Sequence, residues 1–558
     1  MYVTGNGKTS APRHNPAHLT LRRPVSIFSI FEKGIICMRQ LVLGLLILAV
    51  HAAGESRTVF AVRCGAAMHP AAARGRLLVA LARAATPEPA ATIGSTDRGA
   101  PCVFARDADD AAPGAMLFVS TDDEYSPHDA RPCASGTGPV PALPPGDWYA
   151  QAVLDCNPDL RGPRAPGNMC SDVVRVTVAP GARDTVQIDL TRSYPPDELP
   201  PDGEQMKFVK IRSALLSAFH RRPMYLRAAV LLPKDFPREP SRRYPLVISI
   251  GGYGASYDWM AEAANTEGRF HRAWLADSLP RMIRLYLDGR GPFGDPYQVN
   301  SANNGPYGDA LLTELIPYVE KKFRGAGTPA GRFLEGASTG GWVSLALQVL
   351  YPDSFNGTWS QSPDGVDFRA LELVDIYRDT NAFINASGFE RPAAREVNGD
   401  VLWTMRHEVQ VENVLGRGNS YTLSGGQWGA WNAVYGPRGA DGLPVPLWDA
   451  HTGRINHAVA EVWKRYDLRL ILQEQWPTLG PKLRGKIHVW VGDADNFFLN
   501  NAVHMLDDFL SHASPPPGGY IRYGPGKGHV SMPMTLYAML KEMEERYLQA
   551  GSSHVRSP

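Results

Sequence analysis

Short stretches of alternating apolar and polar residues fill the chain from about residue 57 to residue 195. Clusters of Pro, Gly and Asp, which favour turns, separate these stretches. They are TVFAVRC (58–64), GRLLVALARA (75–84), AMLFVST (115–121), DWYAQAVLD (147–155), DVVRVTVA (172–179) and DTVQIDL (184–190). Such alternation places every second side chain on the same face of a strand. The regular spacing of the stretches therefore predicts an all-β domain over 57–195, folded as an Ig-like sandwich.

The pattern changes after a proline-rich acidic segment, and we assign a linker to 196–206. Nearly continuous apolar stretches then alternate with stretches of helical period. The predicted strands are 226–233, 244–250, 281–289, 331–336, 357–362 and 486–492, and the predicted helices are 308–324, 340–350 and 499–512. This alternation predicts an α/β domain over 207–548 with a mostly parallel sheet. The aromatic, glycine-rich region of about 362–480 breaks the pattern and predicts an inserted cap.

Composition and charge exclude few classes of protein. The chain has 558 residues, enough for two or three domains, and 44% hydrophobic and 20% charged residues are ordinary proportions for a globular protein. The formal net charge is only +1, so we expect no nucleic-acid partner. No uninterrupted apolar stretch reaches 18 residues, so we expect no stable membrane span.

The N-terminal region carries a candidate export signal. The sequence MRQLVLGLLILAVHAAGES begins at Met38, with one basic residue, a ten-residue apolar core and a small-residue cleavage site. We therefore predict a signal peptide over 38–54, an upstream extension over 1–37, and a periplasmic or secreted mature protein. A buried N-terminal hairpin is the alternative interpretation.

Cysteine usage agrees with export. Four of the six cysteines lie between residues 100 and 170, where an oxidising compartment favours disulfides. Neighbouring positions suggest that Cys156 pairs with Cys170, and Cys102 with Cys133, whereas free buried thiols are the alternative. No pair of Cys or His residues has metal-ligand spacing, so we expect no metal.

The stretch GRFLEGASTGGWVSLALQVL (331–350) contains Gly336-Ala337-Ser338-Thr339-Gly340, a G-x-S-x-G pattern. In a chain with 54 glycines this pattern alone is weak. Its context strengthens it, because a predicted strand ends directly before Ser338 and a predicted helix follows. A serine on such a sharp strand-to-helix turn is exposed above the sheet and acts as a nucleophile. Ser338 is therefore the predicted nucleophile.

Serines of this kind are followed along the chain by an acid and then by a histidine. The sequence HVWVGDADNFF supplies two acids after a predicted strand, Asp493 and Asp495. Farther on, GGYIRYGPGKGHVSM is a strand that ends in a glycine-rich loop carrying His529. His488, within a predicted strand, and His504, within a predicted helix, are better explained as structural residues. We therefore expect His529 to be the catalytic base.

An oxyanion hole requires two backbone N–H donors near the nucleophile. One is expected from Thr339, the residue after Ser338. The other is expected from the loop in ISIGGYGASYDW, with Tyr253 as the preferred donor. An ordinary tight turn is the alternative explanation of that glycine run.

Residues from about 210 to 545 resemble the Putative esterase family of α/β-hydrolases, which includes esterase D-type enzymes, feruloyl esterases, enterochelin esterases and mycolyltransferases. The resemblance rests on YPLVISIGGYG, YGDALLTELIPYVEKKFR, EGASTGGWVSLALQVLYPDSFNG, VGDADNF and GKGHVS. It implies an α/β-hydrolase fold with Ser338 as nucleophile, Asp495 rather than Asp493 as the orienting acid, and His529 as base. Two departures are the long insert and Gly251, which stands where the family often has a histidine.

These features together predict a serine esterase that hydrolyses a small-molecule or glycan-linked ester without cofactor or metal. A serine peptidase of prolyl oligopeptidase type, an acyltransferase on the same fold and a non-catalytic binding protein are the alternatives. DADN (493–496) does not continue as a calcium loop, and RHEVQ (406–410) lacks the second histidine of a zinc helix. Five aromatic residues of the insert either line a substrate pocket or form its core: Trp403, Trp428, Trp431, Tyr435 and Trp448.

Overall fold

The computed structural model describes residues 58–65, 73–96, 99–126, 143–179, 184–258, 269–531 and 534–554. The predicted upstream extension and signal peptide, residues 1–54, lie outside these ranges. None of the described helices is both long enough and apolar enough to cross a membrane.

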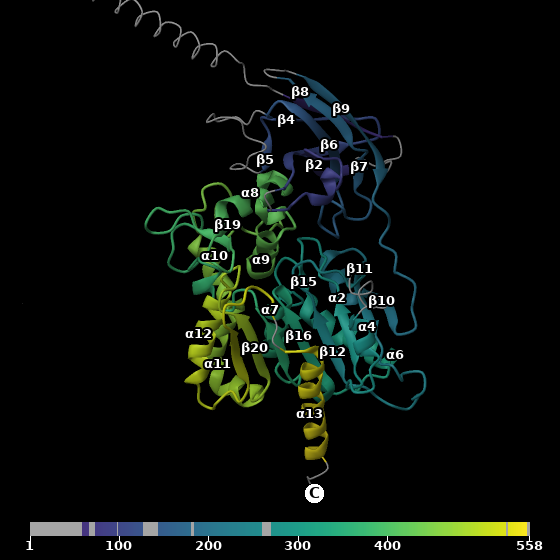
Figure 1. The fold of residues 1–558 in the computed structure, drawn as a ribbon, viewed down its shortest axis with the longest axis vertical. Coiled ribbons are helices and arrows are strands. Elements are labelled where there is room, and N and C mark those ends of the chain that lie inside the picture. Colours follow the sequence, from purple (N-terminus) through teal and green to yellow (C-terminus); the bar gives the residue numbers. More distant parts are fainter. Residues whose placement is uncertain are drawn as a thin grey trace, which may run out of the picture. The chain divides into compact units, whose positions relative to one another are not determined.

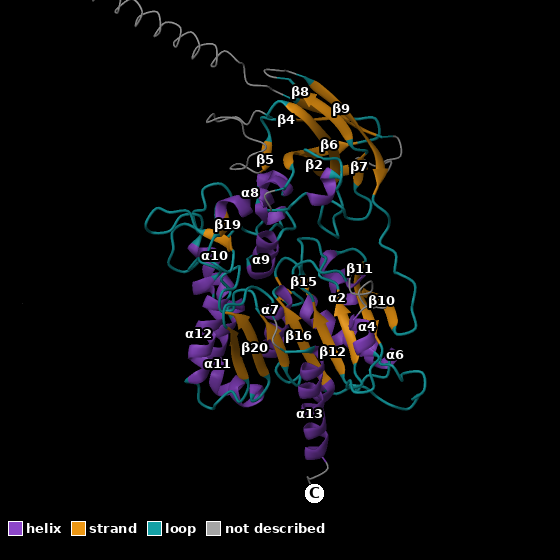
Figure 2. Cartoon of the chain, in the orientation of Figure 1, coloured by secondary structure: helices purple, strands orange, loops and turns teal. Residues whose placement is uncertain are grey.

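Residues 59–193, here called the N-terminal β segment, form a nine-stranded sheet (Figures 1 and 2). Its strands are β1 (Val59–Cys64), β2 (Ala73–Ala82), β3 (Cys102–Ala111), β4 (Met116–Ser120), β5 (Glu124–Ser126), β6 (Gly146–Asp155), β7 (Met169–Ser171), β8 (Val174–Val178) and β9 (Thr185–Ser193). All six predicted strands are present. β9 pairs in parallel with β1 and antiparallel with β7, so a single sheet forms. This pairing differs from the two separate antiparallel sheets of an Ig-like sandwich.

The second sheet has eight strands in the order β10-β11-β13-β12-β16-β17-β20-β21. They are β10 (Met206–Ser213), β11 (Met224–Leu231), β12 (Leu246–Ile250), β13 (Ile283–Leu287), β16 (Arg332–Ala337), β17 (Thr358–Gln361), β20 (Ile487–Gly492) and β21 (Tyr520–Gly524). From β13 to β21 neighbouring strands run parallel, whereas β10 and β11 form an antiparallel edge. The sheet is therefore mixed, as in an α/β-hydrolase. Two short hairpins lie outside it: β14 (Asn300–Ser301) with β15 (Gly305–Pro306), and β18 (Pro392–Arg395) with β19 (Val401–Thr404).

Helices flank this sheet, and Figure 2 shows α11 and α12 beside β20. The described helices are α2 (Ala214–His220), α4 (Arg269–Trp274), α5 (Tyr307–Ala310), α6 (Ile316–Lys322), α7 (Thr339–Leu350), α8 (Met405–Leu415), α9 (Gln427–Tyr435), α10 (His457–Trp463), α11 (Leu468–Leu483), α12 (Asn500–Ser511) and α13 (Leu536–His554). The helix predicted over 308–324 forms as α5 and α6 joined by a π turn, Leu311–Leu315. Pro317, in the first turn of α6, has no N–H to donate to the preceding turn, which favours this irregularity.

The insert of about 362–480 contributes β18, β19 and helices α8 to α11. Its large aromatic side chains Trp428, Trp431, Tyr435 and Trp448 are buried in the same apolar core as strands of the eight-stranded sheet. Trp403 is only partly buried and packs against that core. These aromatic residues therefore stabilise the attachment of the insert, as the core interpretation predicts.

The predicted Cys156–Cys170 disulfide is wrong, because both thiols are free, as is Cys64. The strand register explains this: Cys170 lies opposite Val153, three residues before Cys156. Three residues of strand span roughly 10 Å, which exceeds the reach of a disulfide. Cys102 is disulfide-bonded, with a partner outside the described residues. Its predicted pairing with Cys133 stays a prediction, because residue 133 also lies outside them.

Candidate active site

Ser338 lies at the junction between β16 and α7, with φ 58° and ψ −123°. Positive φ is strained for a residue with a side chain, and it turns the chain sharply from strand into helix. The glycines on either side allow the close approach that this turn requires. A Cβ atom on Gly340 would collide with the carbonyl oxygen of Ile250 in β12, and one on Gly336 would collide with Gly340. The local geometry is therefore the strand–turn–helix that the sequence pattern predicts.

Asp495 and His529 are brought together at the carboxyl ends of β20 and β21. His529 Nδ1 lies 2.9 Å from Asp495 Oδ2, and the Asp495 side chain is fully buried. The other oxygen, Oδ1, accepts a 2.9 Å hydrogen bond from the backbone N–H of Phe497. His529 is held in turn by its backbone N–H, which donates to the Asn496 side chain at 2.8 Å. A buried carboxylate at Nδ1 fixes the orientation and tautomer of the imidazole ring.

The competing acid, Asp493, is exposed and accepts a 2.7 Å hydrogen bond from the backbone N–H of Gly526. This hydrogen bond stabilises the loop before His529. The imidazole of His529 contacts Asp495 instead. The geometry thus favours Asp495 of the two acids that the sequence offers.

Ser338 does not hydrogen-bond to His529 within the described residues. Its hydroxyl instead makes a weak contact, 3.5 Å long, with Oδ1 of Asp364. A rotation about the Cα–Cβ bond is the ordinary way for a serine hydroxyl to change partners. The structure therefore shows the acid–histidine pair assembled and the serine turned toward a third carboxyl group.

Asp364, which sequence reasoning missed, follows the end of β17. It is buried, and its Oδ2 accepts from the hydroxyls of Tyr297 at 2.8 Å and Thr339 at 2.9 Å. Two side chains of the insert helix α9 add longer contacts of 3.3 Å each, Gln427 and Trp431. Burial raises the pKa of Asp364, while the hydrogen bonds from Tyr297 and Thr339 act in the opposite direction. An acid directly after a strand that neighbours the nucleophile strand is a signal that could have identified it.

The predicted oxyanion loop, Gly251–Gly254, lies against the nucleophile. A Cβ atom on Gly252 would be 3.9 Å from Cβ of Ser338. In the described part of the chain, the backbone N–H groups of Tyr253 and Thr339 have no hydrogen-bond acceptor. The Tyr253 hydroxyl donates to the carbonyl oxygen of Gly425 in the insert. Neither predicted donor is therefore engaged by another group of the described residues.

Asp295 holds the Gly251–Gly254 loop through a hydrogen bond that its side chain accepts. Its Oδ2 accepts a 3.1 Å hydrogen bond from the backbone N–H of Gly254, and its Oδ1 accepts from that of Tyr297 at 2.9 Å. Burial raises the pKa of Asp295 to about 7. The loop conformation thus depends on a buried carboxyl group rather than on the glycines alone.

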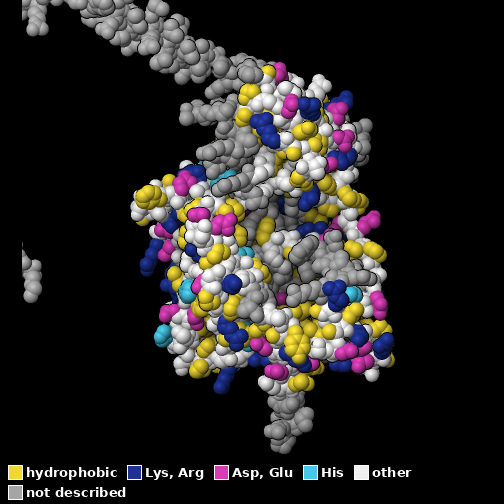
Figure 3. Space-filling view, viewed as in Figure 1, with side chains coloured by type: hydrophobic (Ala, Val, Ile, Leu, Met, Phe, Trp, Pro, Cys, Tyr) yellow, Lys and Arg dark blue, Asp and Glu magenta, His cyan; other side chains and the backbone are white. Residues whose placement is uncertain are grey.

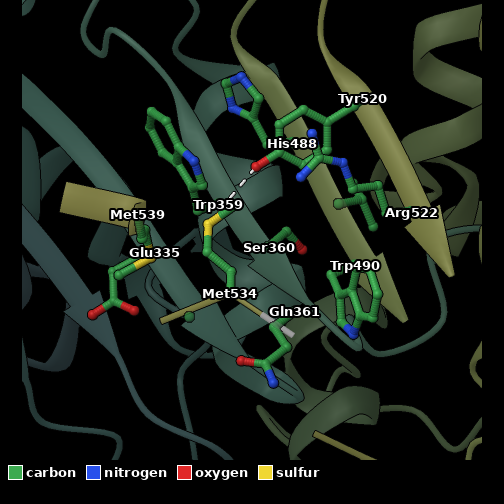
Figure 4. Close-up of a pocket in the computed structure, with 12 residues that line it drawn as sticks. Glu335, Trp359, Ser360, Gln361, His488, Trp490, Tyr520, Arg522, Met534 and Met539 are labelled. Carbon is green, nitrogen blue, oxygen red and sulfur yellow. Dashed lines mark hydrogen bonds between the residues drawn. The ribbon is translucent and has the colours of Figure 1, made fainter. Parts of the chain in front are cut away.

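The two other histidines considered from the sequence have structural surroundings. His488 in β20 stacks on Trp359 with ring centroids 4.4 Å apart and contacts Tyr520, in a hollow on the face of the sheet (Figure 4). His504 in α12 stacks on Tyr523. Neither residue contacts Ser338 or Asp495. Across the residues that the structure describes, no group of three or more His, Cys, Asp or Glu side chains could hold a metal ion.

Comparisons with known proteins identify the family of the chain. A family model described as Putative esterase matches residues 222–514, slightly more than half of the chain. This range includes Ser338 and Asp495 and ends before His529. No curated protein sequence matches the chain significantly.

Solved structures similar to the chain are distant. They include a ferulic acid esterase with 16% identity and a TM-score of 0.35, covering 58% of this chain and 92% of that one. An S-formylglutathione hydrolase from Agrobacterium tumefaciens has 11% identity and a TM-score of 0.32, with 62% and 94% covered. A ferulic acid esterase from Anaeromyces mucronatus, solved with ferulic acid, has 12% identity and a TM-score of 0.28, with 62% and 92% covered. The family assignment accordingly rests on the family model.

Proposed function

The chain belongs to the Putative esterase family and is a carboxylic ester hydrolase by class, and we propose that it is a serine esterase whose nucleophile is Ser338. The observation that carries this proposal is the 2.9 Å contact between His529 and the buried Asp495, at the same sheet edge as the strained Ser338 turn. The carboxyl ends of parallel strands meet at this edge, where α/β proteins place their ligands.

In the proposed reaction, Ser338 attacks the carbonyl carbon of an ester while His529 accepts the hydroxyl proton. With Nδ1–H directed at Asp495, the Nε2 atom of His529 is free to act as base. The serine hydroxyl must first turn from Asp364 toward His529, which a substrate in the site would favour by occupying the space beside Asp364. His529 then gives the proton to the leaving alcohol, and water releases the acid from the acyl-enzyme.

Negative charge develops on the carbonyl oxygen during both steps. The backbone N–H groups of Thr339 and Tyr253 are proposed to bind this oxygen, since both lack another acceptor and Thr339 begins α7. The positive end of the α7 dipole adds to this stabilisation. No step requires a metal or an organic cofactor.

The remaining proposals concern the setting of the reaction. We propose a small-molecule or glycan-linked ester as substrate, and export through the signal peptide of residues 38–54. The domain limits proposed from the sequence are 57–195 for the β domain, 196–206 for the linker and 207–548 for the hydrolase domain.

The decisive experiment compares the mature protein with Ser338→Ala on short-chain p-nitrophenyl esters. We expect turnover by the wild type and background rates for the variant. A fluorophosphonate probe provides the independent control, because it labels an activated serine whatever the natural substrate is. Absence of both turnover and labelling in a folded wild-type protein would contradict the proposal. Labelling of Ser338→Ala would show that another residue is the nucleophile.

A further inference from the structure

A cleft lined by arginines lies where the N-terminal β segment, the loops before β11 and after β13, and the insert meet. Its lining includes Arg74, Arg161, Arg222, Arg417, Arg438 and His220. The same lining contains two asparagines and no Asp or Glu. Lysines, arginines and acids are otherwise interspersed over the face of the molecule in Figure 3. The lining of the cleft, whose charges have one sign, therefore differs from the mixed charges of that face.

Carboxylates outside the lining neutralise these arginines only in part. Arg74 and Arg417 share one oxygen of Asp109, at 3.2 and 2.7 Å. Arg222 pairs with Asp159 at 2.6 Å. Three carboxylates, the third being Asp155, thus face five guanidinium groups, which leaves an excess of two positive charges.

Two of the five guanidinium groups retain unused donors. Arg161 is 3.7 Å from Asp155, and its buried Nε has no hydrogen-bond partner among the described residues. Burial raises the pKa of Asp155 to about 6, so this carboxyl group is still mostly ionised at pH 7 and counts as one negative charge facing Arg161. Arg438 donates its Nε to the carbonyl oxygen of Gly442 and, within the described chain, has no carboxylate partner. Bidentate oxyanion groups match such free guanidinium donors.

His220 does not contribute a further charge at neutral pH. Burial lowers its pKa, and Arg222 and Arg438 lower it further. Its Nε2 lies 3.0 Å from the carbonyl oxygen of Asn304, so this nitrogen carries the proton. The positive charge of the cleft is therefore that of the arginines.

Apolar side chains complete the lining, among them Phe293, Leu423 and Leu443. From these observations we propose that the cleft binds a multiply charged anionic ligand, with phosphate or carboxylate groups on the arginines and an apolar part against these side chains. This binding does not depend on the proposed ester hydrolysis.

The cleft shares a wall with the candidate active site. The stem of Arg161 packs so closely on Gly425 that a Cβ atom there would collide with its Cγ. The carbonyl oxygen of Gly425 accepts the hydroxyl of Tyr253, whose backbone N–H is the proposed oxyanion donor. Arg161, which would bind the anion, is therefore separated from the oxyanion loop by one residue, Gly425.

Binding is tested with the full chain by calorimetry, using inorganic phosphate and citrate at constant ionic strength. We expect saturable binding of at least one of them and a rise in melting temperature with its concentration. Binding of citrate alone identifies carboxylate groups as the ligand chemistry, and binding of phosphate alone identifies phosphate groups.

Arg438→Gln should weaken this binding about tenfold or more, because a charge-assisted contact is lost. Arg438 is exposed, so the variant should fold, and Arg161→Gln provides a second variant that removes a different donor. Arg238→Gln is the matched control, since Arg238 is 81% exposed and lies outside the cleft. The proposal is overturned if neither anion binds the folded wild type, or if both cleft variants bind as tightly as the wild type does.

Discussion

At the scale of single residues, Asp364 is the main addition that the structure makes to the site predicted from the sequence, because its carboxyl group contacts Ser338. Its partners come from three separate segments: Ser338 with Thr339, Tyr297, and helix α9 with Gln427 and Trp431. The serine–acid–histidine order along the chain does not distinguish Asp364 from Asp495, because both lie between Ser338 and His529. Its carboxyl group connects the insert helix α9 with the turn that carries the nucleophile.

Asp364→Asn should lower kcat about tenfold or more with little change in KM. The four donors at Oδ2 will retain the amide oxygen, so the amide N–H₂ will face Ser338 and donate to its hydroxyl oxygen. A hydrogen bond donated to Oγ withdraws electron density from the nucleophile, which slows attack without altering substrate contacts. Steady-state kinetics and the rate of fluorophosphonate labelling measure this effect.

Asp493→Asn is the control for the loss of a carboxylate in this region, since Asp493 is exposed and does not contact Ser338. Equal kcat values for Asp364→Asn and the wild type would show that Asp364 has only a structural role.

Positions that depend on local sequence could be predicted, and contacts that depend on strand register could not. The motif and its flanking periodicity predicted the strand–helix turn at Ser338, and the loop after the last strand predicted the place of His529 in the fold. The Cys156–Cys170 pairing was wrong because nearness in sequence does not fix which residues face each other across β6 and β7. Asp364 was missed because the residues next to it in the sequence do not show that Tyr297, Gln427 and Trp431 contact it.

At the scale of secondary-structure elements, the turn between β16 and α7 requires small residues on both sides of Ser338. Gly340→Ala should destabilise the protein by about 3 kcal/mol or more and abolish hydrolysis, because its Cβ would collide with the backbone oxygens of Ile250 and Gly251 rather than with a movable side chain. Thermal unfolding and ester turnover measure both effects.

Gly99→Ala is the matched control for this substitution, because a Cβ atom there meets no atom of the described residues within 4 Å. A Gly340→Ala variant with wild-type stability would show that the elbow can relax, which would contradict the strain argument.

Strands with a clean pattern of apolar residues were predictable, and strands whose pattern is mixed were not. The strands from β11 to β20 that flank the elbow are nearly continuous apolar stretches. β10 was missed because its sequence, MKFVKIRS, mixes apolar and basic residues and directly follows the linker. β3 was missed because its second half, RDADDA, reads as a loop although the strand continues through it. Pairing with β2 overrides this weak local preference.

His488 makes strand β20 sensitive to acid. Burial lowers its pKa to about 4 from 6.5 in the unfolded chain. Between these values the unfolded chain binds a proton that the folded protein does not, so stability should rise with pH and be lost as the pH falls from 6.5 to 4. The full effect is roughly 3 kcal/mol.

His488→Phe retains the stacking between Trp359 and Tyr520 and removes the titrating group. We therefore expect the urea midpoint of this variant to change less between pH 6.5 and pH 4 than that of the wild type. Parallel pH profiles for the two proteins would show that other groups cause the acid sensitivity.

At the scale of the whole molecule, the insert and the N-terminal β segment pack against each other. Val414 and Leu415 of α8 join Leu78, Ala80 and Val103 in one apolar cluster. Arg76 lies beside this cluster and is almost fully buried. Its Nε donates to the carbonyl oxygen of Val414 at 2.9 Å, and its terminal nitrogens donate to Asp107 and Asn419, each at 2.8 Å. The same insert also contacts Asp364 through Gln427 and Trp431 of α9. We therefore expect the packing of the β segment on the insert to influence the candidate active site.

Arg76→Met should therefore destabilise the protein by about 3–5 kcal/mol, since it leaves the polar groups around Arg76 without their donors in a buried setting. Arg63→Met is the control: its partner Asp189 is equally well aligned, but both side chains are about half exposed, so solvent screens this ion pair and its loss should destabilise the protein much less. Urea unfolding followed by tryptophan fluorescence measures both changes. If the insert depends on this packing, the Arg76 variant should also lose ester turnover at urea concentrations below its unfolding midpoint. Similar losses of stability for the two variants would mean that the buried contact with the insert contributes no more than a surface ion pair.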